Sequence, residues 1–357
     1  MDNPIQAYED IKDGIRRYIK SAFKTNSPTF EAERDALLRR PGVLFQDAYI
    51  EPMPAYAGGK PLAGLDGTDL PTLDEASIKA YKAVVGAGLF SGPYSLYVHQ
   101  QRMVTQSLQG KHCVVVTGTG SGKTESFLLP ALATIVKEAS SWLPCDAAGA
   151  DWPAAGLWEV DRCKRRGETR KAAVRALVLY PMNALVEDQV SRLRKALDSK
   201  SVREALDEHL GGNRIRFGRF NGSTPVSGHP VKADNSPNTN KRTECNARIE
   251  DAIAEDRAMD KLLSDRGAVV AGLQKKVADM EDGDPNRLQL AEQLEVARNE
   301  LKKAEQARLF IPSASIDSAE MFHRWEMQRN PPDILVTNTS MLSVMLMRHA
   351  APSAKND

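Results

Sequence analysis

The segment that decides the fold of this chain is Val114-Val115-Val116-Thr117-Gly118-Thr119-Gly120-Ser121-Gly122-Lys123-Thr124. It begins with a β-branched run that favours a strand, continues as a glycine-rich turn, and leads into Glu125-Ser126-Phe127-Leu128-Leu129, which favours a helix. Glycines let the backbone turn tightly, so that its N–H groups point inward at phosphate oxygens, and the helix N-terminus adds the positive end of its dipole. We therefore predict a phosphate-binding loop, since a chance glycine-rich turn would leave the flanking strand and helix unexplained.

Two residues at the end of this segment carry the expected chemistry. Lys123 can reach the β- and γ-phosphates of ATP, and the Thr124 hydroxyl can ligate Mg²⁺, so both are predicted to be catalytic residues. The general pattern of such loops has a glycine where Thr117 stands in this chain. The predicted cofactors are ATP and Mg²⁺, held by Thr117, Gly118, Thr119, Gly120, Ser121, Gly122, Lys123, Thr124 and Glu125.

The composition limits the class of protein. The chain has 357 residues, enough for two or three domains of roughly 100–200 residues each. Its 48 Lys and Arg residues balance 47 Asp and Glu residues, which gives no support to a basic nucleic-acid wrapper, an acidic tail or a membrane-surface protein. The N-terminus is polar, no apolar run reaches the ~20 residues that span a bilayer, and the four cysteines form no CxxC pair. We expect a cytoplasmic protein with free thiols and no membrane contact.

Residues 1–92 are predicted to form a helical accessory domain. Helices are expected from the first residues onward, at about 28–38 and at about 73–85, with a Gly- and Pro-rich loop at 55–71. The apolar stripe of the first helix is expected to be buried as core, because most amphipathic helices bury that face; its members are Ile5, Tyr8, Ile11, Ile15, Tyr18 and Phe23.

Residues 93–357 have the pattern of an α/β domain. Short β-branched apolar runs at 113–116, 176–180, 215–220 and 334–337 alternate with helical segments. This alternation predicts a parallel sheet flanked by helices.

Two insertions interrupt the α/β pattern. Residues 140–172 read as a loop whose basic residues either touch phosphate or, as we favour, face solvent; these are Lys164, Arg165, Arg166 and Arg170. Residues 240–310 contain two heptad helices around the turn signal at 282–286, and so predict an antiparallel coiled-coil hairpin. Its expected seam is Met259, Leu263, Arg266, Val270, Leu273, Val277 and Met280 on one helix and Leu290, Leu294, Ala297, Leu301 and Ala304 on the other.

Four further stretches resemble, in the right order, the motifs of superfamily 2 helicases of the DEAD/DEAH type. They are residues 96–100 (LYVHQ), 177–189 (with YPMNAL at 180–185), 220–224 (FNGST) and 332–342 (with TNTSML at 337–342). The resemblance implies a RecA-like P-loop NTPase fold in which Gln100 reads the adenine edge and Tyr97 or His99 packs on the base. It also implies that a nucleic-acid strand is contacted through its backbone by Pro181, Met182, Asn183, Asn221, Gly222, Ser223, Thr337, Asn338, Thr339 and Ser340.

The residues of these motifs are similar to those of the corresponding motifs in the large helicases of bacterial phage-defence loci, such as the DISARM DrmA type. The resemblance spans roughly residues 94–345 and implies an ATP-dependent helicase or translocase in anti-phage defence. The expected nucleic-acid partner is a single strand or a duplex end, with DNA favoured over RNA.

One element of the family pattern is missing. No strand carrying an Asp-Glu pair follows residue 342, and no second RecA-like half is present. We therefore expect residues 93–357 to be an incomplete first RecA-like domain, inactive alone, whose hydrolysis needs the rest of a helicase or a partner subunit. A truncated product, a fragment of a longer protein and a subunit of a split motor all fit, and a fragment is favoured.

Two alternatives come from other classes. The chain could be a non-hydrolysing scaffold that docks partners through its helical hairpin, or an unrelated P-loop ATPase. The intact Lys123-Thr124 pair speaks against the scaffold for the complete protein, and an unrelated ATPase would leave the motifs after the loop unexplained.

Overall fold

The computed structural model divides the chain into two compact units, Met1–Ala55 and Tyr56–Asp357. It describes residues 3–47, 49, 55–90, 92, 94–118, 120–145, 152–153, 155–232, 234–280 and 286–350, and the side chains of 348–350 are not among the described ones. The predicted boundary between residues 92 and 93 falls within the larger unit, so the extent of the accessory domain stays a prediction.

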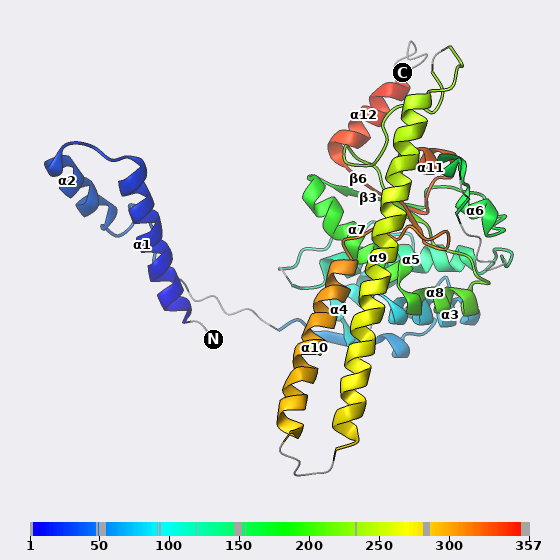
Figure 1. The fold of residues 1–357 in the computed structure, drawn as a ribbon, viewed down its shortest axis with the longest axis horizontal. Helices are drawn as coiled ribbons and strands as arrows, with labels where there is room; N and C mark the ends of the chain where they lie inside the picture. Colours follow the sequence, from blue (N-terminus) through cyan, green and yellow to red (C-terminus); the bar gives the residue numbers. More distant parts are fainter. Residues whose placement is uncertain are drawn as a thin grey trace. The chain divides into compact units, whose positions relative to one another are not determined.

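A four-stranded parallel sheet organises the larger unit (Figure 1). Its strands are β3 (Ala176–Tyr180), β6 (Ile334–Asn338), β4 (Phe217–Arg219) and β5 (Glu320–Met321), in that order. β3 and β6 pair in register from Ala176 beside Ile334 to Tyr180 beside Asn338, so their carboxyl ends meet at one edge. The sheet and the helices around it confirm the predicted α/β class.

Helices pack their apolar faces into one core around this sheet. They are α3 (Glu75–Ala87), α4 (Val98–Leu108), α5 (Lys123–Ala139), α7 (Asn183–Asp198) and α8 (Lys200–His209). Leu128, Leu129 and Leu132 of α5 are fully buried, as are Val190 and Leu193 of α7. A short antiparallel pair, β1 (Gly58–Pro61) and β2 (Ser95–Tyr97), and the single turn η1 (Leu62–Gly64) lie before α4.

The strand predicted at residues 113–116 does not form. The described residues 111–118 have no regular secondary structure, and Val114 and Val116 are each 89% exposed. A strand exists only where a neighbouring backbone supplies its hydrogen bonds, and no described strand runs beside this segment. The β-branched run therefore stays extended without joining the sheet.

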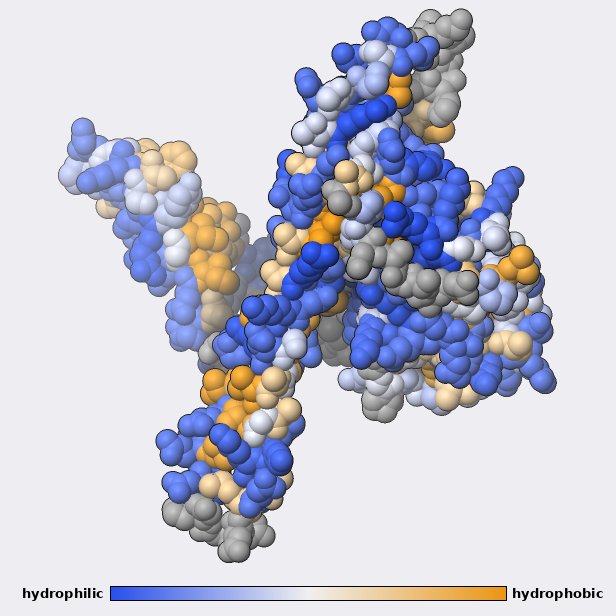
Figure 2. Space-filling model, turned by 45° about the vertical axis from the view of Figure 1, so that its right-hand side comes forward, coloured by the Kyte–Doolittle hydropathy of each residue, from blue (hydrophilic) through white to orange (hydrophobic). Residues whose placement is uncertain are grey.

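The smaller unit contains α1 (Pro4–Ala22) and α2 (Pro28–Leu38), both capped by side chains, Asn3 and Ser27, with proline in the first turn. Within this unit the apolar stripe of α1 does not form the predicted core, because neither helix has a buried residue. Ile5 is 73% and Tyr18 66% exposed, and Figure 2 shows apolar residues on the surface of this unit. Two short helices cannot enclose a core of their own.

The second insertion forms two long helices, α9 (Thr239–Ala278) and α10 (Arg287–Arg308). They run antiparallel, because Arg266 pairs with Glu300 and Arg308 pairs with Asp256. All twelve residues of the predicted seam are buried or half-buried. The lower part of the pair extends past the sheet region (Figure 1). The predicted turn at 282–286 lies outside the described residues apart from Asn286.

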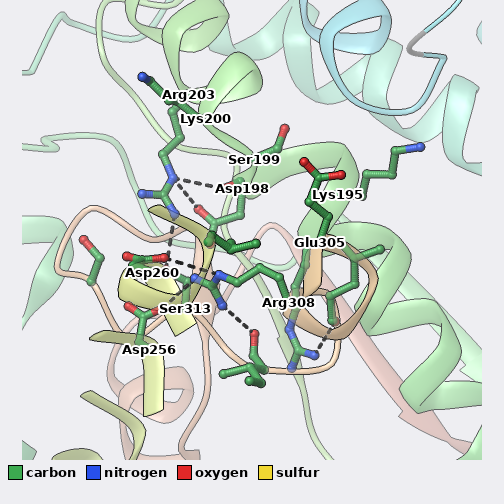
Figure 3. A pocket seen from close by; sticks show the side chains of 15 residues that line it. Lys195, Asp198, Ser199, Lys200, Arg203, Asp256, Asp260, Glu305, Arg308 and Ser313 are labelled. Carbon is green, nitrogen blue, oxygen red and sulfur yellow. Dashed lines mark hydrogen bonds and ion pairs between the residues drawn. The ribbon is translucent and has the colours of Figure 1, made fainter. Parts of the chain in front are cut away.

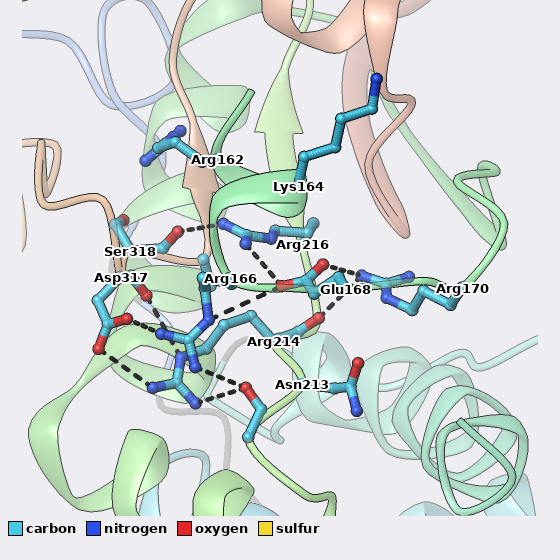
Figure 4. Close-up of polar contacts among 12 residues, drawn as sticks. Arg162, Lys164, Arg166, Glu168, Arg170, Asn213, Arg214, Arg216, Asp317 and Ser318 are labelled. Atoms are coloured by element: carbon cyan, nitrogen blue, oxygen red, sulfur yellow. Dashed lines mark hydrogen bonds and ion pairs between the residues drawn. The ribbon is translucent and has the colours of Figure 1, made fainter. Parts of the chain in front are cut away.

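The basic cluster of the first insertion is solvated only in part: Lys164 and Arg165 are exposed, as predicted, whereas the side chains of Arg166 and Arg170 are buried. This segment forms η2 (Leu157–Glu159) and α6 (Arg162–Arg165), and Arg166 is fully buried, whereas Lys164 is exposed. A buried guanidinium is tolerated only when it is paired with carboxylates and carbonyls. Figure 4 shows these arginines interleaved with acidic partners, including the 2.6 Å pair of Arg216 with Glu168. Local charge density could not reveal the partners that are distant in sequence, such as Asp317 for Arg166 and Asp333 for Arg170.

The last part of the chain contributes two helices beside β5 and β6. α11 (Arg324–Arg329) follows β5 and buries Trp325 in a second small core with Leu157 and Phe322. α12 (Thr339–Ala350) starts directly after β6.

Candidate nucleotide and nucleic-acid sites

Two glycines give the phosphate loop its shape. Gly120 has a φ of 75° and Gly122 a φ of 71°, in the left-handed region that glycine adopts without strain. Gly122 is the N-cap of α5, so Lys123 and Thr124 open the helix and its free N–H groups point into the loop. The loop is thus formed at a helix N-terminus even though residues 111–118 before it form no strand.

Side chains of the loop bond to its own backbone. Ser121 is fully buried, and its Oγ lies 2.6 Å from Thr117 Oγ1 and 2.8 Å from the Gly118 carbonyl oxygen. Lys123 is exposed and its Nζ donates to the Thr117 carbonyl at 3.0 Å. Thr119 lies outside the described residues. The ammonium group is therefore held across the loop, where an anion would meet it.

The first turn of α4 forms hydrogen bonds with the C-terminal end of the phosphate loop. Gln100 is 2% exposed; its Nε2 donates to the Gly122 carbonyl at 3.1 Å and its Oε1 accepts from the Tyr97 N–H at 2.9 Å. The ring of His99 lies with Nε2 2.9 Å from the Ser121 carbonyl, which can only accept, so this nitrogen carries the hydrogen. Sequence reasoning assigned these residues to the base, whereas here they also hold the loop.

An aromatic cluster lies beside the loop. The rings of Tyr97 and His99 stack at 5.5 Å, and Tyr56 meets both edge-on, at 5.5 and 5.8 Å. A Cβ at Gly118 would lie 2.7 Å from the Tyr56 hydroxyl, so glycine permits this approach. Sequence reasoning missed Tyr56, because only the β1–β2 pairing brings its loop next to Tyr97.

The predicted strand-contacting residues meet at the carboxyl edge of the sheet. Asn183, the first residue of α7 after β3, accepts hydrogen bonds at its Oδ1 from Asn221 Nδ2 at 3.2 Å and from Asn338 Nδ2 at 2.6 Å. Asn221 follows β4 and Asn338 ends β6. Three motifs separated by up to 155 residues are therefore joined at one point, because the ends of adjacent parallel strands share one edge.

The other predicted contact residues surround this asparagine cluster (Asn183, Asn221 and Asn338). Those that face outward at the ends of the strands are exposed; they are Pro181, Met182, Gly222, Ser223, Thr339 and Ser340. Thr337 differs, because it is fully buried and its hydroxyl donates to the Phe220 carbonyl. Thr337 therefore holds two strand ends together, and its contact with a strand of nucleic acid stays a prediction.

A separate cavity of about 630 Å³ lies between α7, α8 and the base of the hairpin (Figure 3). None of the phosphate-loop residues lines it. Its buried charges pair with one another: Arg203 with Asp198 at 3.0 Å, and Arg308 with Asp256. Burial raises the pKa of Asp256, and Arg308 opposes that rise. These charged residues of the cavity therefore neutralise one another, and the cavity is separate from the nucleotide site.

Two comparisons with known proteins found similarities. Residues 97–225 match the family model of the DEAD/DEAH box helicase, the stretch that runs from the aromatic cluster to the turn after β4. The chain is similar to the Druantia protein DruE of Escherichia coli (strain UMEA 4076-1), with 28% identity over 349 residues. These residues are 95% of this chain and 16% of DruE, so the chain spans about a sixth of that relative. The two findings confirm the predicted resemblance to superfamily 2 helicases of phage-defence loci. No solved structure matches the chain.

Among the helices of the described residues, none combines the length and the apolar character required to cross a membrane.

Proposed function

We propose that this chain is the ATP-binding and nucleic-acid-strand-binding part of a cytoplasmic superfamily 2 helicase or translocase that acts in bacterial anti-phage defence. The observation that carries the proposal is the asparagine cluster, in which three helicase-like motifs converge at the carboxyl edge of the sheet. The similarity to the Druantia protein supports the defence role.

The nucleotide site follows from the loop and its surroundings. The N-terminal amides of α5 and the Lys123 ammonium bind the phosphates of ATP, and Thr124 ligates Mg²⁺. The adenine packs against the aromatic cluster of Tyr56, Tyr97 and His99, since a flat base and an aromatic ring gain from stacking. Gln100 binds the loop and the base edge.

The strand site follows from the asparagine cluster. Amide groups and the first turns of α7 and α12 bind phosphate and sugar oxygens, which are the same for every base. The chain is therefore proposed to grip a strand without sequence preference, with DNA as the favoured partner.

Hydrolysis is proposed to need groups supplied from elsewhere in the complete protein or by a partner, namely an Asp-Glu pair and a second RecA-like half. One face of β3 supports this proposal, because Leu177 and Leu179 point to the same side of the strand and are 46% and 42% exposed. Val114 and Val116 are exposed in the same way on the segment before the loop. Further parts of the complete protein packed against these residues would bury both sets of side chains.

The test is ATP hydrolysis stimulated by a single-stranded oligonucleotide, measured on the complete protein and on this chain. We expect activity from the complete protein, loss of that activity in its Lys123→Ala variant, and none from the chain. Lys60→Ala serves as the control, because this lysine pairs with Asp69 and does not contact the loop. Full activity of the complete Lys123→Ala protein would refute the proposal that it is an ATP-driven helicase or translocase.

A second candidate is a scaffold that docks a partner through the hairpin. The observation in its favour is the set of apolar residues exposed outside the seam, among them Val269 at 55% and Val296 at 63%. Under this alternative the complete protein keeps its biological activity in Lys123→Ala and loses it when these valines become polar.

A further inference from the structure

Tyr180 lies at the junction between the nucleotide loop and the strand-binding helix. It is the last residue of β3, and its hydroxyl donates a 3.0 Å hydrogen bond to Oε1 of Gln189 in α7. Thr124, the residue expected to ligate Mg²⁺, is among the groups near the same hydroxyl. Burial raises the pKa of Tyr180, while Arg192 and the Thr124 hydroxyl oppose that rise. The Tyr180 phenol is thus hydrogen-bonded to α7 and lies near the threonine that is expected to ligate Mg²⁺.

Gln189 is the second member of this junction. It is 1% exposed, and its Nε2 finds no hydrogen-bond acceptor among the described residues. A buried amide donor without an acceptor is unfavourable, so this side chain gains from any rearrangement that brings an oxygen to it. The hydrogen bond from Tyr180 fixes one end of the amide and leaves the other unsatisfied.

A second bridge ties the same two helices together. Glu125, next to Thr124, pairs with Arg192 of α7 at 3.3 Å, and Arg192 in turn pairs with Asp188 at 3.0 Å. The first turn of α5 is thus joined to the middle of α7. The N-terminus of α7 is Asn183, the acceptor at the centre of the asparagine cluster.

We propose that Tyr180 and Gln189 are positioning residues that couple occupation of the metal and phosphate site at Thr124 to α7, and thereby to the grip on the nucleic-acid strand. This inference rests on the proposed function. When the Thr124 oxygen ligates Mg²⁺ its hydrogen bonding changes, and the Tyr180 hydroxyl reorients between Thr124 and Gln189. No covalent bond changes; the hydrogen bonds redistribute, and α7 moves as a unit because its residues pack in the core.

Coupling of this kind is reciprocal. If Mg-ATP strengthens strand binding by a certain factor, the strand must strengthen Mg-ATP binding by the same factor. A residue that only supports the fold changes both affinities together, whereas a coupling residue changes this factor. The factor by which Mg-ATP changes the affinity for the strand is therefore the measurement that distinguishes a coupling residue from a structural one.

The experiment measures the dissociation constant of a fluorescent oligothymidine for the complete protein, with and without Mg²⁺ and a non-hydrolysable ATP analogue. We expect the two constants to differ by about fivefold or more in the natural protein, the lower end of typical allosteric coupling. Tyr180→Phe keeps the ring and removes the hydroxyl, so the factor should fall towards one while each ligand alone still binds. Gln189→Met should act in the same way, and Tyr94→Phe, at a tyrosine that is 69% exposed, should leave the factor unchanged.

Each result of this experiment either supports or overturns the proposed coupling role of Tyr180 and Gln189. A natural protein without coupling, or a Tyr180→Phe variant that retains it, overturns the inference and leaves the helicase proposal intact. Equal loss of both affinities in Tyr180→Phe makes the tyrosine a structural residue and also overturns the inference. A natural protein that binds neither ligand refutes the proposed function itself.

Discussion

Gln100 and Gly122 are joined by a 3.1 Å hydrogen bond from the glutamine Nε2 to the glycine carbonyl oxygen, across 22 residues of sequence. The contact is so close that a Cβ on Gly122 would lie 2.2 Å from that nitrogen. The start of α4 and the phosphate loop are therefore fitted to each other, and Gly122 is required for two reasons: its φ of 71° and the space that Gln100 occupies.

Gly122→Ala should weaken ATP binding. The added methyl group must displace Gln100, and the loop amides then move from the positions that bind phosphate. We expect the dissociation constant for ATP to rise by about tenfold or more, equivalent to about 1.4 kcal/mol, in a titration calorimetry measurement.

The matched control for this variant is Gly110→Ala. Gly110 has a similar φ of 78°, but a Cβ there would meet nothing within 4 Å. Both variants carry a backbone strain of about 1 kcal/mol, so both should lose some thermal stability, and only Gly122→Ala should lose ATP affinity. Equal affinities would show that Gln100 does not shape the loop.

Asn183→Ala should weaken strand binding without changing its base preference. The substitution removes the oxygen that holds Asn221 and Asn338 in place, which are two hydrogen bonds of roughly 1 kcal/mol each. We expect the affinity for single-stranded oligonucleotides to fall by roughly fivefold to thirtyfold. The loss should be the same for oligonucleotides of different sequence, because the contacts are to the backbone.

The control is Asn299→Ala, at an exposed asparagine of the hairpin, which should bind as the natural protein does. A loss that depends on the base sequence would contradict the backbone-contact interpretation.

The sequence predicts those features of this fold that depend on local pattern. The strand at 176–180 was predicted residue for residue, and the seam of the hairpin follows from its heptads, because periodicity reports which face of an element is buried. The phosphate loop could also be found, since its glycines are needed by the turn itself.

Long-range pairing accounts for what the sequence could not show. The valines at 114–116 have strong strand propensity, but no neighbour within the described residues completes their hydrogen bonds. Arg166 looked like a solvated charge because its partner Asp317 is far along the chain. Tyr56 has no local signal at all, since its place beside the loop is set by strand pairing. In each case the deciding partner is distant in sequence.

His323 should make the protein sensitive to mild acid. Burial lowers its pKa to about 4; Glu326 opposes this, and Arg162 and Arg329 reinforce it. The unfolded chain binds a proton near pH 6.5, whereas the folded protein stays neutral, so stability is complete above pH 6.5 and falls as the pH decreases towards 4. We expect a loss of about 2 kcal/mol between pH 7 and pH 5, measured by urea unfolding.

His323→Asn isolates this contribution. His323 is the N-cap of α11 and accepts the Glu326 N–H, a role that asparagine performs well. The variant should show a smaller slope of stability against pH in that range, whatever its absolute stability. Its counterpart His112→Asn, at an exposed histidine, should retain the full slope. An unchanged slope in His323→Asn would assign the acid sensitivity to other groups.

Leu294→Ala should loosen the hairpin while leaving ATP binding intact. Leu294 is 7% exposed and occupies the seam between α10 and α9, so its truncation should cost about 2–4 kcal/mol of local stability. Val296, two residues later, is 63% exposed, and Val296→Ala should change stability by no more than about 0.5 kcal/mol. Hydrogen exchange of peptides from α9 and α10 measures the difference directly. Faster exchange confined to these helices, with ATP affinity unchanged, would show that the hairpin is held by its own seam; equal exchange in the two variants would mean that the seam does not hold the helices together.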